Sequence, residues 1–429
     1  MPNLLDFAST ATGSSRDDAV GRAATGRSGR TPRVLVVHNR YQIRGGEDVV
    51  VDREVAALRR AGIAVETVFL DNAAIRGPVD RARAFLETAH APRGIAQVLG
   101  AVARVRPDVV HVHNVMPLIS PGVHRAVRAA GAATVQTLHN FRVACANGIL
   151  MREGGPCEDC LTGSPYQAVL HRCYRGSIPG SFAVARMIDR HRRAGTWLHD
   201  VDRFIALTRF ARSRFLAAGL PEERIAVKPN GLPDPGRPVA RARRGVVFAG
   251  RLSAEKGVGV LAQAAALGTV PVTVIGEGPM AEALAGAPGL ALVGRQGASA
   301  VRAAMERASA VVVPSLCYEG QPTVLVEAFA AGTPVIGSRL GGLAELIEDG
   351  ATGLLVPPGD PRALAAAIAR LAADPAEGRR MGAAGRAVFE RTWTEAVTTA
   401  ALVDLYREAV AARAADPLAP HPIARRSVA

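Results

Sequence analysis

The sequence predicts an α/β protein made of two doubly wound parallel-sheet domains that face each other across a cleft. Short apolar runs alternate with helical segments along most of the chain, as expected for parallel strands joined by crossover helices. A proline-rich basic segment, residues 231–244, interrupts this alternation, which then starts again. With 429 residues, of which 48% are apolar, each half is long enough to bury a core of its own.

The first half begins after a stretch that lacks apolar periodicity. Residues 1–31 are rich in Ser, Thr, Gly and Arg, so we expect them to be disordered. We expect the first domain to span residues 32–230, where apolar runs are separated by helical segments. Its clearest strands are predicted at residues 34–38, 64–70, 108–113, 133–139 and 203–207. Its clearest helices are predicted at residues 47–61 and 94–106.

The second half repeats the pattern after the segment 231–244, which is predicted to be a linker between domains. We expect the second domain to span 245–390, a helical segment to follow at 391–415, and residues 416–429 to form a flexible tail. The predicted strands are 245–250, 270–276, 290–294, 310–314, 333–338 and 353–357, with clear helices at 299–308 and 361–373. Ligands of such sheets bind beyond the carboxyl ends of the strands, so residues at strand ends are the candidates for function.

Net charge is +14, and half of it comes from residues 171–216, which hold ten Arg against three Asp. Such a surface suits an anionic bilayer or a phosphorylated substrate. An aromatic content of 4% argues against nucleic acid, because few side chains could stack on bases. An arginine-rich composition without a partner explains the charge equally well, and both interpretations stay open.

The sequence carries no sign of a membrane span or a secretory leader. No uncharged apolar run approaches the ~18 residues that a bilayer requires, and the first ten residues, MPNLLDFAST, lack a basic and then apolar leader. We therefore expect a cytoplasmic protein, with peripheral attachment to the inner face of the membrane as an extension of that expectation. The five cysteines should then be reduced.

Two acidic residues lie around a strand, loop and helix in the second domain. The apolar run 308–315 ends in Pro-Ser, and Pro322 follows where a helix can begin, because proline has a fixed φ and no N–H to satisfy. Glu319 precedes this helix and Glu327 lies about one turn inside it. Their carboxylates could accept hydrogen bonds from a sugar ring and a ribose. In this order of elements, a nucleotide-sugar site is favoured over two solvated acids.

The same segment offers a place for phosphate groups. The first N–H groups of the helix, near Thr323, form a ready site for a pyrophosphate. Gly320 would let the backbone approach the ligand closely, because it has no side chain.

This stretch resembles the family 4 retaining glycosyltransferases, which have a GT-B fold. Their pattern is a Pro-Ser strand end, a Glu-Gly, a short loop, and a Glu-Ala helix followed by Gly-x-Pro-Val, all present between residues 314 and 335. The resemblance implies that Glu319 contacts the hydroxyls of the donor sugar and Glu327 contacts the ribose. Where members often have Phe-Gly-Leu, this chain has Gln321, Pro322 and Thr323, so the resemblance does not identify the donor.

Basic residues follow the first strand of the second domain. In GRLSAEKG, Arg251 and Lys256 could meet at the cleft and offset the charge of a diphosphate, Arg with a bidentate fork and Lys with a mobile point charge. The pair matches the phosphate-binding pair of the family. In the first domain, Gly45 and Gly46 of RGGED could let a phosphate approach, and family members have a glycine-rich donor or acceptor loop there. The segment is not GxGxxG, which argues against a dinucleotide-dependent dehydrogenase.

Two histidines close strands of the first domain, His113 in HVHN and His139 in TLHN. A strand-end histidine alone is more often structural than catalytic. The resemblance implies that His139 lies beside the transferred sugar, and it makes His113 a candidate on the acceptor side. Asn230, in KPNG, matches a motif before the linker that is expected to shape the hinge.

The resemblance also implies a mechanism. Retaining transfer on this fold uses no dedicated nucleophile, and the leaving phosphate assists deprotonation of the acceptor hydroxyl at the front face. His139, Glu319, Arg251 and Lys256 are the implied catalytic residues. The two basic ones would stabilise charge that grows on the diphosphate. No Asp-x-Asp is needed beside the phosphates, so we expect no catalytic divalent metal. The segment 391–415 is expected to cross back to the first domain.

Four of the five cysteines cluster in residues 141–175, an insertion after the TLHN strand that also occurs in a subset of bacterial members of the family. They form one C-x2-C pair flanked by two single cysteines: Cys145, Cys157, Cys160 and Cys173. Four thiols in a reducing compartment suggest a tetrahedral structural zinc site. Unpaired thiols or a stray disulfide are the alternatives to a metal site.

We therefore expect a retaining glycosyltransferase that moves a sugar from a nucleotide diphosphate sugar to a lipid-linked or polysaccharide-precursor acceptor. The alternatives are another GT-B enzyme, such as a nucleotide-sugar epimerase, and a non-catalytic, zinc-bearing carbohydrate-binding or scaffold protein. Turnover of donor with and without an acceptor would separate the three.

Overall fold

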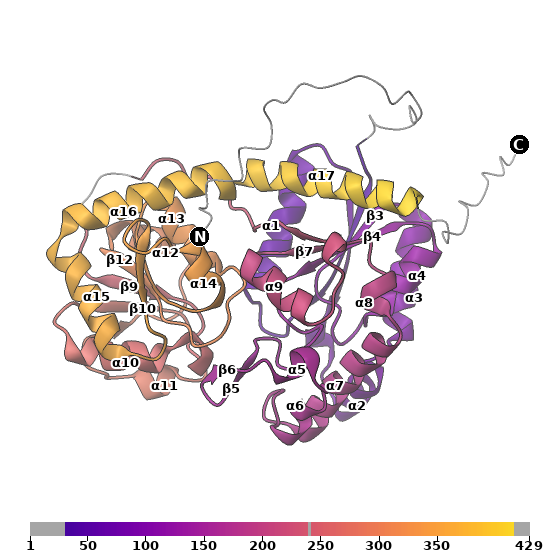
Figure 1. The fold of residues 1–429 in the computed structure, drawn as a ribbon, viewed down its shortest axis with the longest axis horizontal. Helices are drawn as coiled ribbons and strands as arrows, with labels where there is room; N and C mark the ends of the chain where they lie inside the picture. The colour runs from indigo at the N-terminus through magenta and orange to yellow at the C-terminus, as the bar shows by residue number, and fades with distance from the viewer. Residues whose placement is uncertain (1–30, 239–241, 416–429) are drawn as a thin grey trace, which may run out of the picture. The chain divides into compact units, whose positions relative to one another are not determined.

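A computed structural model describes residues 31–238 and 242–415, and these contain two six-stranded sheets in which every pair of strands is parallel (Figure 1). The predicted α/β class with two doubly wound sheets is therefore confirmed. The predicted tail 416–429, and the predicted disordered extension 1–31 apart from Thr31, lie outside the described residues.

The first sheet has the strand order β2-β1-β3-β4-β7-β8. Its strands are β1 Val34–Arg40, β2 Val65–Asp71, β3 Val109–Val112, β4 Ala133–Leu138, β7 Arg203–Ala206 and β8 Ile225–Val227. The α-helices of this half, apart from two short ones, are α1 Gly46–Arg60, α2 Pro78–Glu87, α3 Pro92–Val105, α4 Val123–Ala129, α7 Ile178–Arg193, α8 Thr196–His199 and α9 Arg209–Ala217. Residues of β3 and β4 are buried throughout, because helices cover both faces of the sheet.

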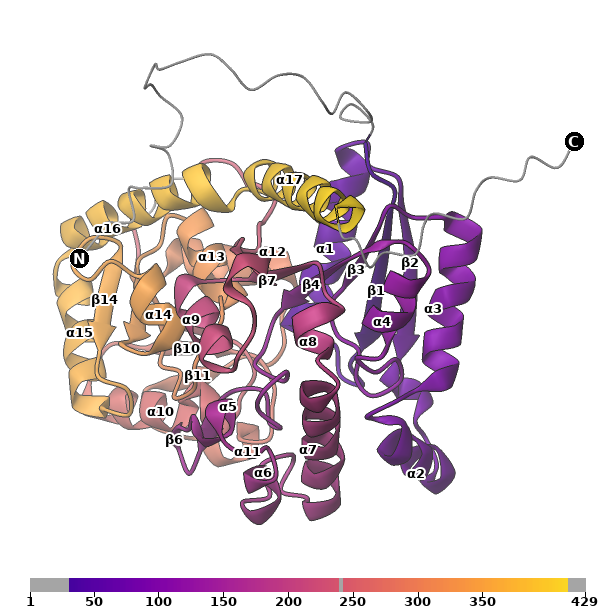
Figure 2. The ribbon, with the colours of Figure 1, turned by 45° about the vertical axis from the view of Figure 1, so that its right-hand side comes forward.

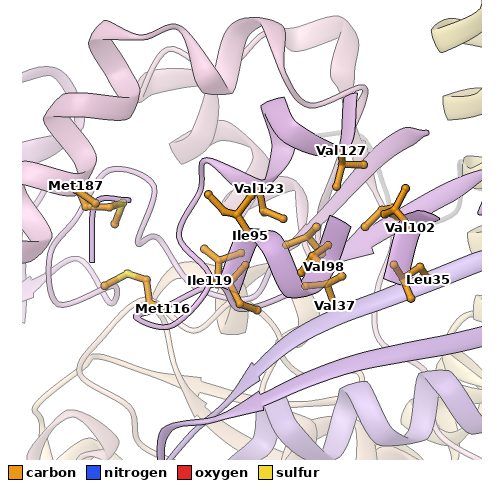
Figure 3. Packing of buried hydrophobic residues seen from close by; sticks show 14 of the residues in the cluster. Leu35, Val37, Ile95, Val98, Val102, Met116, Ile119, Val123, Val127 and Met187 are labelled. Carbon is orange, nitrogen blue, oxygen red and sulfur yellow. The ribbon is translucent and has the colours of Figure 1, made fainter. Parts of the chain in front are cut away.

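Alternate residues of β1 point into two separate cores. Leu35 and Val37 pack against α3 and α4 through residues such as Ile95, Val98 and Val127 (Figures 2 and 3). On the opposite face, Val34 and Val36 belong to a core with residues of α1 and of the last helix. The period of two along the strand explains why one continuous apolar run serves both faces.

The second sheet has the order β11-β10-β9-β12-β13-β14. Its strands are β9 Val246–Ala249, β10 Val272–Ile275, β11 Leu290–Leu292, β12 Ala310–Val313, β13 Val335–Ser338 and β14 Gly353–Val356. The helices are α10 Val258–Leu267, α11 Ala281–Leu284, α12 Ala298–Arg307, α13 Thr323–Ala330, α14 Gly341–Leu346, α15 Pro361–Ala373 and α16 Pro375–Val388. Strands β9 and β12 are neighbours at the centre, so the loops that follow them lie side by side.

The last helix, α17 (Glu395–Ala414), packs on α1, β3 and β4 of the first sheet after the chain has completed the second sheet (Figure 1). Its Tyr406 is fully buried there and its hydroxyl lies 2.8 Å from Nδ1 of His111 on β3. Just before the helix, Trp393 stacks on Phe329 of α13. Among the described residues, no helix combines the length and the apolar character needed to cross a bilayer.

The segment 141–175 lies between β4 and α7 and contains a small hairpin and two short helices. These are β5 Met151–Arg152, β6 Gly155–Pro156, α5 Asp159–Thr162 and α6 Gln167–Leu170. Strands β5 and β6 pair in the antiparallel sense and join neither large sheet.

Candidate functional site

The loop after β12 brings Glu319 next to Lys256, because β9 and β12 are neighbouring strands. Lys256 Nζ lies 2.6 Å from Oε1 of Glu319, and the Ser315 hydroxyl donates to the same oxygen at 2.7 Å. Burial lowers the pKa of Lys256, but the Glu319 carboxylate outweighs it and leaves that pKa raised. The Lys256 ammonium therefore stays charged beside the Glu319 carboxyl group, where strands β9 and β12 end.

Close backbone approach fixes this arrangement. Gly257 follows Lys256 with φ +69°, and a Cβ there would lie 1.8 Å from the carbonyl oxygen of Pro314. A Cβ on Gly278, in the turn after β10, would lie 2.4 Å from the carbonyl oxygen of Leu252. Both glycines are therefore needed so that the loops after β9, β10 and β12 can pack against one another. Arg251 follows β9 and is exposed.

Helix α13 begins with Thr323, and Pro322 is its N-cap residue. Leu325 N–H donates to the Pro322 carbonyl, whereas the N–H groups of Thr323 and Val324 precede the first bond of the helix. These two groups and the positive end of the helix dipole are the features that were predicted to bind a pyrophosphate, and that role stays a prediction. Along the chain, the N-terminus of α13 thus follows shortly after Glu319, which pairs with Lys256.

Glu327 lies within α13 and contacts the first half of the chain. Both terminal nitrogens of Arg53, on α1, lie 3.4 Å from its Oε1. Burial raises the pKa of the Glu327 carboxyl more than Arg53 lowers it. Glu327, which was predicted to contact a ribose, is therefore held in an ion pair with Arg53, a residue that the sequence analysis did not select.

Gly45 and Gly46 form the start of α1, with Gly45 as N-cap and its N–H bonded to Asp48 Oδ2 at 2.8 Å. A Cβ on Gly46 would meet no atom within 4 Å. The local fold therefore does not require a glycine at position 46, and the space beside it is open to a ligand.

His139 and His113 contact each other at the ends of β4 and β3. Nε2 of His139 lies 2.9 Å from Nδ1 of His113, and the rings are stacked. Burial lowers the pKa of each to about 3, so both imidazoles are neutral at neutral pH. Both rings line a pocket that Glu47, Asn140 and Arg142 also line.

A buried polar network behind these histidines was not expected from the sequence. Oε1 of Glu54, on α1, lies 3.3 Å from Nδ1 of His111 and 3.4 Å from Nε2 of His113, and Lys228 Nζ lies 3.0 Å from Oε2. Burial raises the pKa of Glu54, but Lys228 and His111 outweigh it and hold the pKa well below its usual value.

In the described part of the chain, Glu54, His111 and His113 are the one trio of side chains spaced to hold a metal ion. Lys228 already balances the Glu54 charge, however, and the nitrogens of His111 contact the hydroxyls of Tyr406 and Thr137. The trio therefore fits a charge-balanced structural network better than a metal centre, although Oε1 of Glu54 and Nε2 of His113, which lie 3.4 Å apart, have no hydrogen-bond partner among the described residues. In sequence, Glu54 looks like any solvated helix residue.

Several contacts connect the predicted donor loop to the first half. The side-chain oxygen of Gln321 accepts the N–H of Asn230 at 2.6 Å, and a Cβ on Gly320 would lie 3.7 Å from the His139 carbonyl oxygen. Tyr318 packs edge-on against Phe210, and its hydroxyl bonds to Glu158. Gln321, which departs from the family pattern, thus contacts the KPNG motif.

The four cysteines of residues 141–175 are gathered in one region. Cys145 and Cys160 are buried, Cys157 and Cys173 are partly buried, and all four are free. No three of their sulfurs lie within 4.8 Å of one another. Burial raises the pKa of Cys145 and Cys173, and that of Cys160 to about 12. The proximity predicted from the spacing is present, whereas the closer spacing of a tetrahedral site is not.

Comparison with known proteins agrees with this geometry. Residues 45–231 match the family described as "Glycosyl transferase 4-like domain", and residues 243–374 match "Glycosyl transferases group 1". The chain is 30% identical over 224 residues to the amylovoran biosynthesis glycosyltransferase AmsK of Erwinia amylovora, covering 47% of this chain and 55% of that protein.

A second relative is the GDP-mannose-dependent alpha-(1-6)-phosphatidylinositol monomannoside mannosyltransferase of Mycolicibacterium smegmatis. The two are 32% identical over 238 residues, which cover 48% of this chain and 62% of the relative. The chain therefore spans little more than half the length of these curated relatives.

Solved structures extend the similarity to most of the chain. Sucrose-phosphate synthase from Thermosynechococcus elongatus superposes with a TM-score of 0.66 at 20% identity, covering 89% of this chain and 100% of the other. HepE from Anabaena, solved with UDP and glucose, superposes with a TM-score of 0.61 at 16% identity, covering 87% and 98%. At such identities the likeness concerns the fold. The likeness to the solved structures agrees with a GT-B fold. The two family matches, which together cover most of the chain, show that it belongs to the glycosyltransferases, with a 4-like domain followed by a group 1 domain.

Proposed function

We propose that this protein is a retaining glycosyltransferase that transfers a sugar from a nucleotide diphosphate sugar to a lipid-linked or polysaccharide-precursor acceptor. The observation that carries the proposal is the pairing of Lys256 with Glu319 directly before the N-terminus of α13. A cation, a hydroxyl acceptor and two backbone N–H donors then lie together, and these are the groups that a sugar diphosphate requires.

The proposed donor site belongs mainly to the domain over residues 245–390. Arg251 and Lys256 would bind the diphosphate together with the N–H groups of Thr323 and its neighbour, while Glu319 binds the sugar hydroxyls. Glu327 would accept from the ribose, and the Pro322 and Gly320 backbone would line the loop. The solved complexes of HepE with UDP and with UDP-glucose support this class of donor.

The domain over residues 32–230 would hold the acceptor and one side of the donor. Gly45 and Gly46 leave open space at the start of α1, and His139 would contact the transferred sugar. Because its pKa is lowered to about 3 by burial, His139 would act as a neutral hydrogen-bonding group at neutral pH. His113 is buried against His139 and would orient it on the acceptor side.

In the proposed transfer, the acceptor hydroxyl attacks the anomeric carbon from the face that the phosphate leaves. The departing phosphate oxygen takes the hydroxyl proton, so no enzyme nucleophile is needed. Arg251 and Lys256 would stabilise the charge that grows on the diphosphate, which is the electrostatic contribution that usually dominates. Because these cations and the α13 terminus meet that charge, the proposal requires no catalytic divalent metal.

We place the activity in the cytoplasm, with an acceptor presented at the inner face of the membrane. The name of the mycobacterial relative, which includes a phosphatidylinositol monomannoside, supports a lipid-linked acceptor. The amylovoran relative supports a polysaccharide precursor.

The direct test is binding and turnover of UDP-, GDP- and ADP-sugars by the full chain. A true donor should raise the melting temperature by mass action, and release of the nucleotide should require an acceptor. Lys256→Ala should lose the thermal shift, whereas Arg362→Ala, on the exposed start of α15, should keep it. Retention is tested by determining the anomeric configuration of the product. If no nucleotide sugar shifts the melting temperature, or if Lys256→Ala keeps the full shift, the proposal is wrong.

A further inference from the structure

We infer, on the basis of the proposed function, that a cavity between α2 and α7 binds the phosphate and the adjoining hydrocarbon chain of the acceptor. This selects a lipid phosphate over a free saccharide as the acceptor class. The cavity has a volume of about 380 Å³, which is within the range of small-molecule sites. It is separate from the proposed donor site, because every residue that lines it lies between residues 42 and 184.

Helix α2 packs beside α7 in the first half of the chain, and residues of both helices line the cavity (Figures 1 and 2). The Arg186 side chain, on α7, donates to the Leu86 carbonyl of α2 at 2.7 Å and so connects the two helices. The apolar part of the wall comes from these helices and from the loop after β3, through Ala84, Phe85, Met116, Pro117, Ala183 and Val184.

Two polar side chains of the wall are buried, and both have partners within the protein. Asn72 Nδ2 donates to the Met116 carbonyl at 3.2 Å, and Asn72 Oδ1 accepts from Asn39 at 2.8 Å. The Thr88 hydroxyl donates to the Ala84 carbonyl at 2.5 Å. Among the described residues, no other buried polar side chain lines the cavity. Its interior therefore suits a hydrocarbon chain better than a sugar, whose hydroxyls would find few free partners there.

The exposed part of the cavity is positively charged. Arg81, on α2, and Arg175, between α6 and α7, are both exposed and both line the cavity. Among the described residues that line it there is no Asp or Glu to balance them. Two arginines without a neighbouring acid favour an anionic ligand, and the guanidinium fork matches the oxygens of a phosphate.

The position of Arg175 is defined before any ligand binds. Its φ is +54°, which is unfavourable for a residue other than glycine, so the surrounding structure keeps this conformation. Its guanidinium lies over the Tyr174 ring, with Cζ 5.5 Å from the ring centroid. The Tyr174 N–H in turn donates to the Ser181 hydroxyl of α7 at 2.9 Å. Less side-chain freedom is therefore lost when Arg175 contacts a phosphate.

The cavity adjoins the pocket that His139 lines. Met116 lines both. Arg142 lines the His139 pocket, and its Cζ lies 5.7 Å from the centroid of the Tyr174 ring, which lines the cavity. A lipid phosphate bound at Arg175 would therefore direct a sugar attached to it toward His139, where the transfer is proposed.

Apolar side chains on the same two helices are exposed to solvent. Four of them are between 42% and 67% exposed, namely Val79 and Leu86 on α2 and Ile178 and Phe182 on α7. Exposed apolar side chains that gather beside a cavity are typical of an interaction surface. They would contact the part of a hydrocarbon chain that extends beyond the cavity.

The test is calorimetric titration of the full chain with farnesyl phosphate below its micelle concentration. This soluble probe joins a phosphate to an apolar chain. Farnesol lacks the phosphate, and dimethylallyl phosphate has a much shorter chain. Farnesyl phosphate should bind about 10-fold more tightly than farnesol and about 30-fold more tightly than dimethylallyl phosphate. Equal affinity for farnesyl phosphate and either of the other two compounds would overturn the inference.

Substitutions of the two arginines locate the phosphate. Arg81→Ala and Arg175→Ala should each weaken binding of farnesyl phosphate about 5-fold or more and leave the affinity for farnesol unchanged. Arg83→Ala is the matched control, because Arg83 is exposed on the same helix but does not line the cavity. It removes the same charge and should keep the wild-type affinity. An equal loss in Arg83→Ala and Arg81→Ala would mean a general attraction of anions and would refute the site.

Lys256→Ala separates this cavity from the proposed donor site and should bind farnesyl phosphate as wild type does. If the variant loses this binding, the probe occupies the donor site and the inference is wrong. Wild type that binds a nucleotide sugar but no farnesyl phosphate would keep the proposed function and refute the cavity site. Wild type that binds farnesyl phosphate through Arg81 and Arg175 but no nucleotide sugar would keep the lipid-phosphate site and refute the proposed function.

Discussion

Glu319 is held by two donors that share one of its oxygens. Lys256 and Ser315 both donate to Oε1, so Oε2 is turned toward the other side of the carboxylate, where a ligand hydroxyl could donate to it. The acid is therefore already oriented, and binding need not fix its side chain first. The same pairing gives Lys256 a defined position, although its ammonium must also reach the diphosphate in the proposed transfer.

Lys256→Ala and Arg251→Ala should each reduce the transfer rate more than the stability of the fold. Loss of one preorganised charge at a developing anion costs about 10²-fold or more in kcat. Arg251 is exposed and the Lys256 side chain is 31% exposed, so the loss of unfolding free energy should be on the order of 1 kcal/mol. Steady-state kinetics and denaturant unfolding measure the two effects. Near-normal kcat in both variants would mean that the pair is ordinary surface charge.

Glu327→Ala should weaken binding of the nucleoside diphosphate by about 10- to 100-fold, since a hydrogen bond to a charged group is worth about 1.5–3 kcal/mol. Arg53→Ala should instead strengthen binding of the nucleoside diphosphate. The Arg53–Glu327 contact must loosen for a ribose to reach the carboxylate, and both side chains are 29% exposed, so the gain should be at most about 5-fold. Calorimetric titration with UDP, GDP and ADP checks both. Equal affinity in wild type and Glu327→Ala would remove Glu327 from the site.

At the scale of elements, apolar runs were sufficient to predict most strands, because a parallel strand that is buried on both faces consists almost entirely of apolar residues. The three-residue strand β8 and the β5–β6 hairpin were missed. Both are too short to show periodicity, and they are held by backbone bonds such as that from Cys157 N–H to the Leu150 carbonyl. Lys256 and Glu319 were each selected as site candidates, but their contact was not predicted, because the sequence does not show that β9 and β12 are neighbours. The roles of Glu54 and Arg53 were not predicted either, since their partners Lys228 and Glu327 are 174 and 274 residues away.

The basic segment 171–216 is partly used within the fold. Arg192 bonds to two carbonyl oxygens, and Arg212 and Arg214 pair with Glu222 and Glu158. Arg190 and Arg193 are exposed near the end of α7, although Arg193 also pairs with Asp189 at 3.0 Å. Partners within the fold thus account for some of the arginines. The prediction that the segment is attracted to a membrane surface therefore depends on the exposed arginines.

We expect the protein to float with anionic vesicles at low salt and to remain behind with neutral ones. Each basic residue near such a surface contributes about 1 kcal/mol, which salt screens. The double variant Arg190→Glu/Arg193→Glu should therefore weaken the partition coefficient by about 30-fold or more. Arg379→Glu/Arg380→Glu, on exposed positions of α16, makes the same change in net charge and should have a smaller effect. Equal recovery on both kinds of vesicle would leave composition as the explanation for the charge.

At the scale of the whole molecule, the fold keeps several histidines buried and neutral. Burial lowers the pKa of His113, His124 and His139 to about 3 and that of His191 to about 4, against 6.5 for an unperturbed side chain. They lie in different parts of the first half: His113 and His139 at strand ends, and His124 and His191 around Trp197. In the unfolded chain these histidines would be protonated at pH values at which they are neutral in the native protein.

The unfolding free energy should therefore fall steeply as pH decreases from about 6.5 toward 4. In this window the unfolded chain binds more protons than the native one, so stability is present above pH 6.5 and is lost below it. Each such histidine contributes a slope of about 1.4 kcal/mol per pH unit, and four together would consume a typical stability of 5–15 kcal/mol between about pH 5.5 and 4. Urea unfolding at a series of pH values measures the slope.

His124→Leu provides the sharpest test, because His124 is fully buried against Trp197 and lies away from the proposed donor site. The variant should reduce the slope between pH 6 and 5 by about 1.4 kcal/mol per pH unit, whatever its stability at pH 7. Leu86→Ala, at an exposed side chain that does not titrate, is the control and should leave the slope as it is in wild type. If the slope of His124→Leu equals that of wild type, this imidazole is already protonated in the native state, and the low dielectric ascribed to its surroundings is wrong.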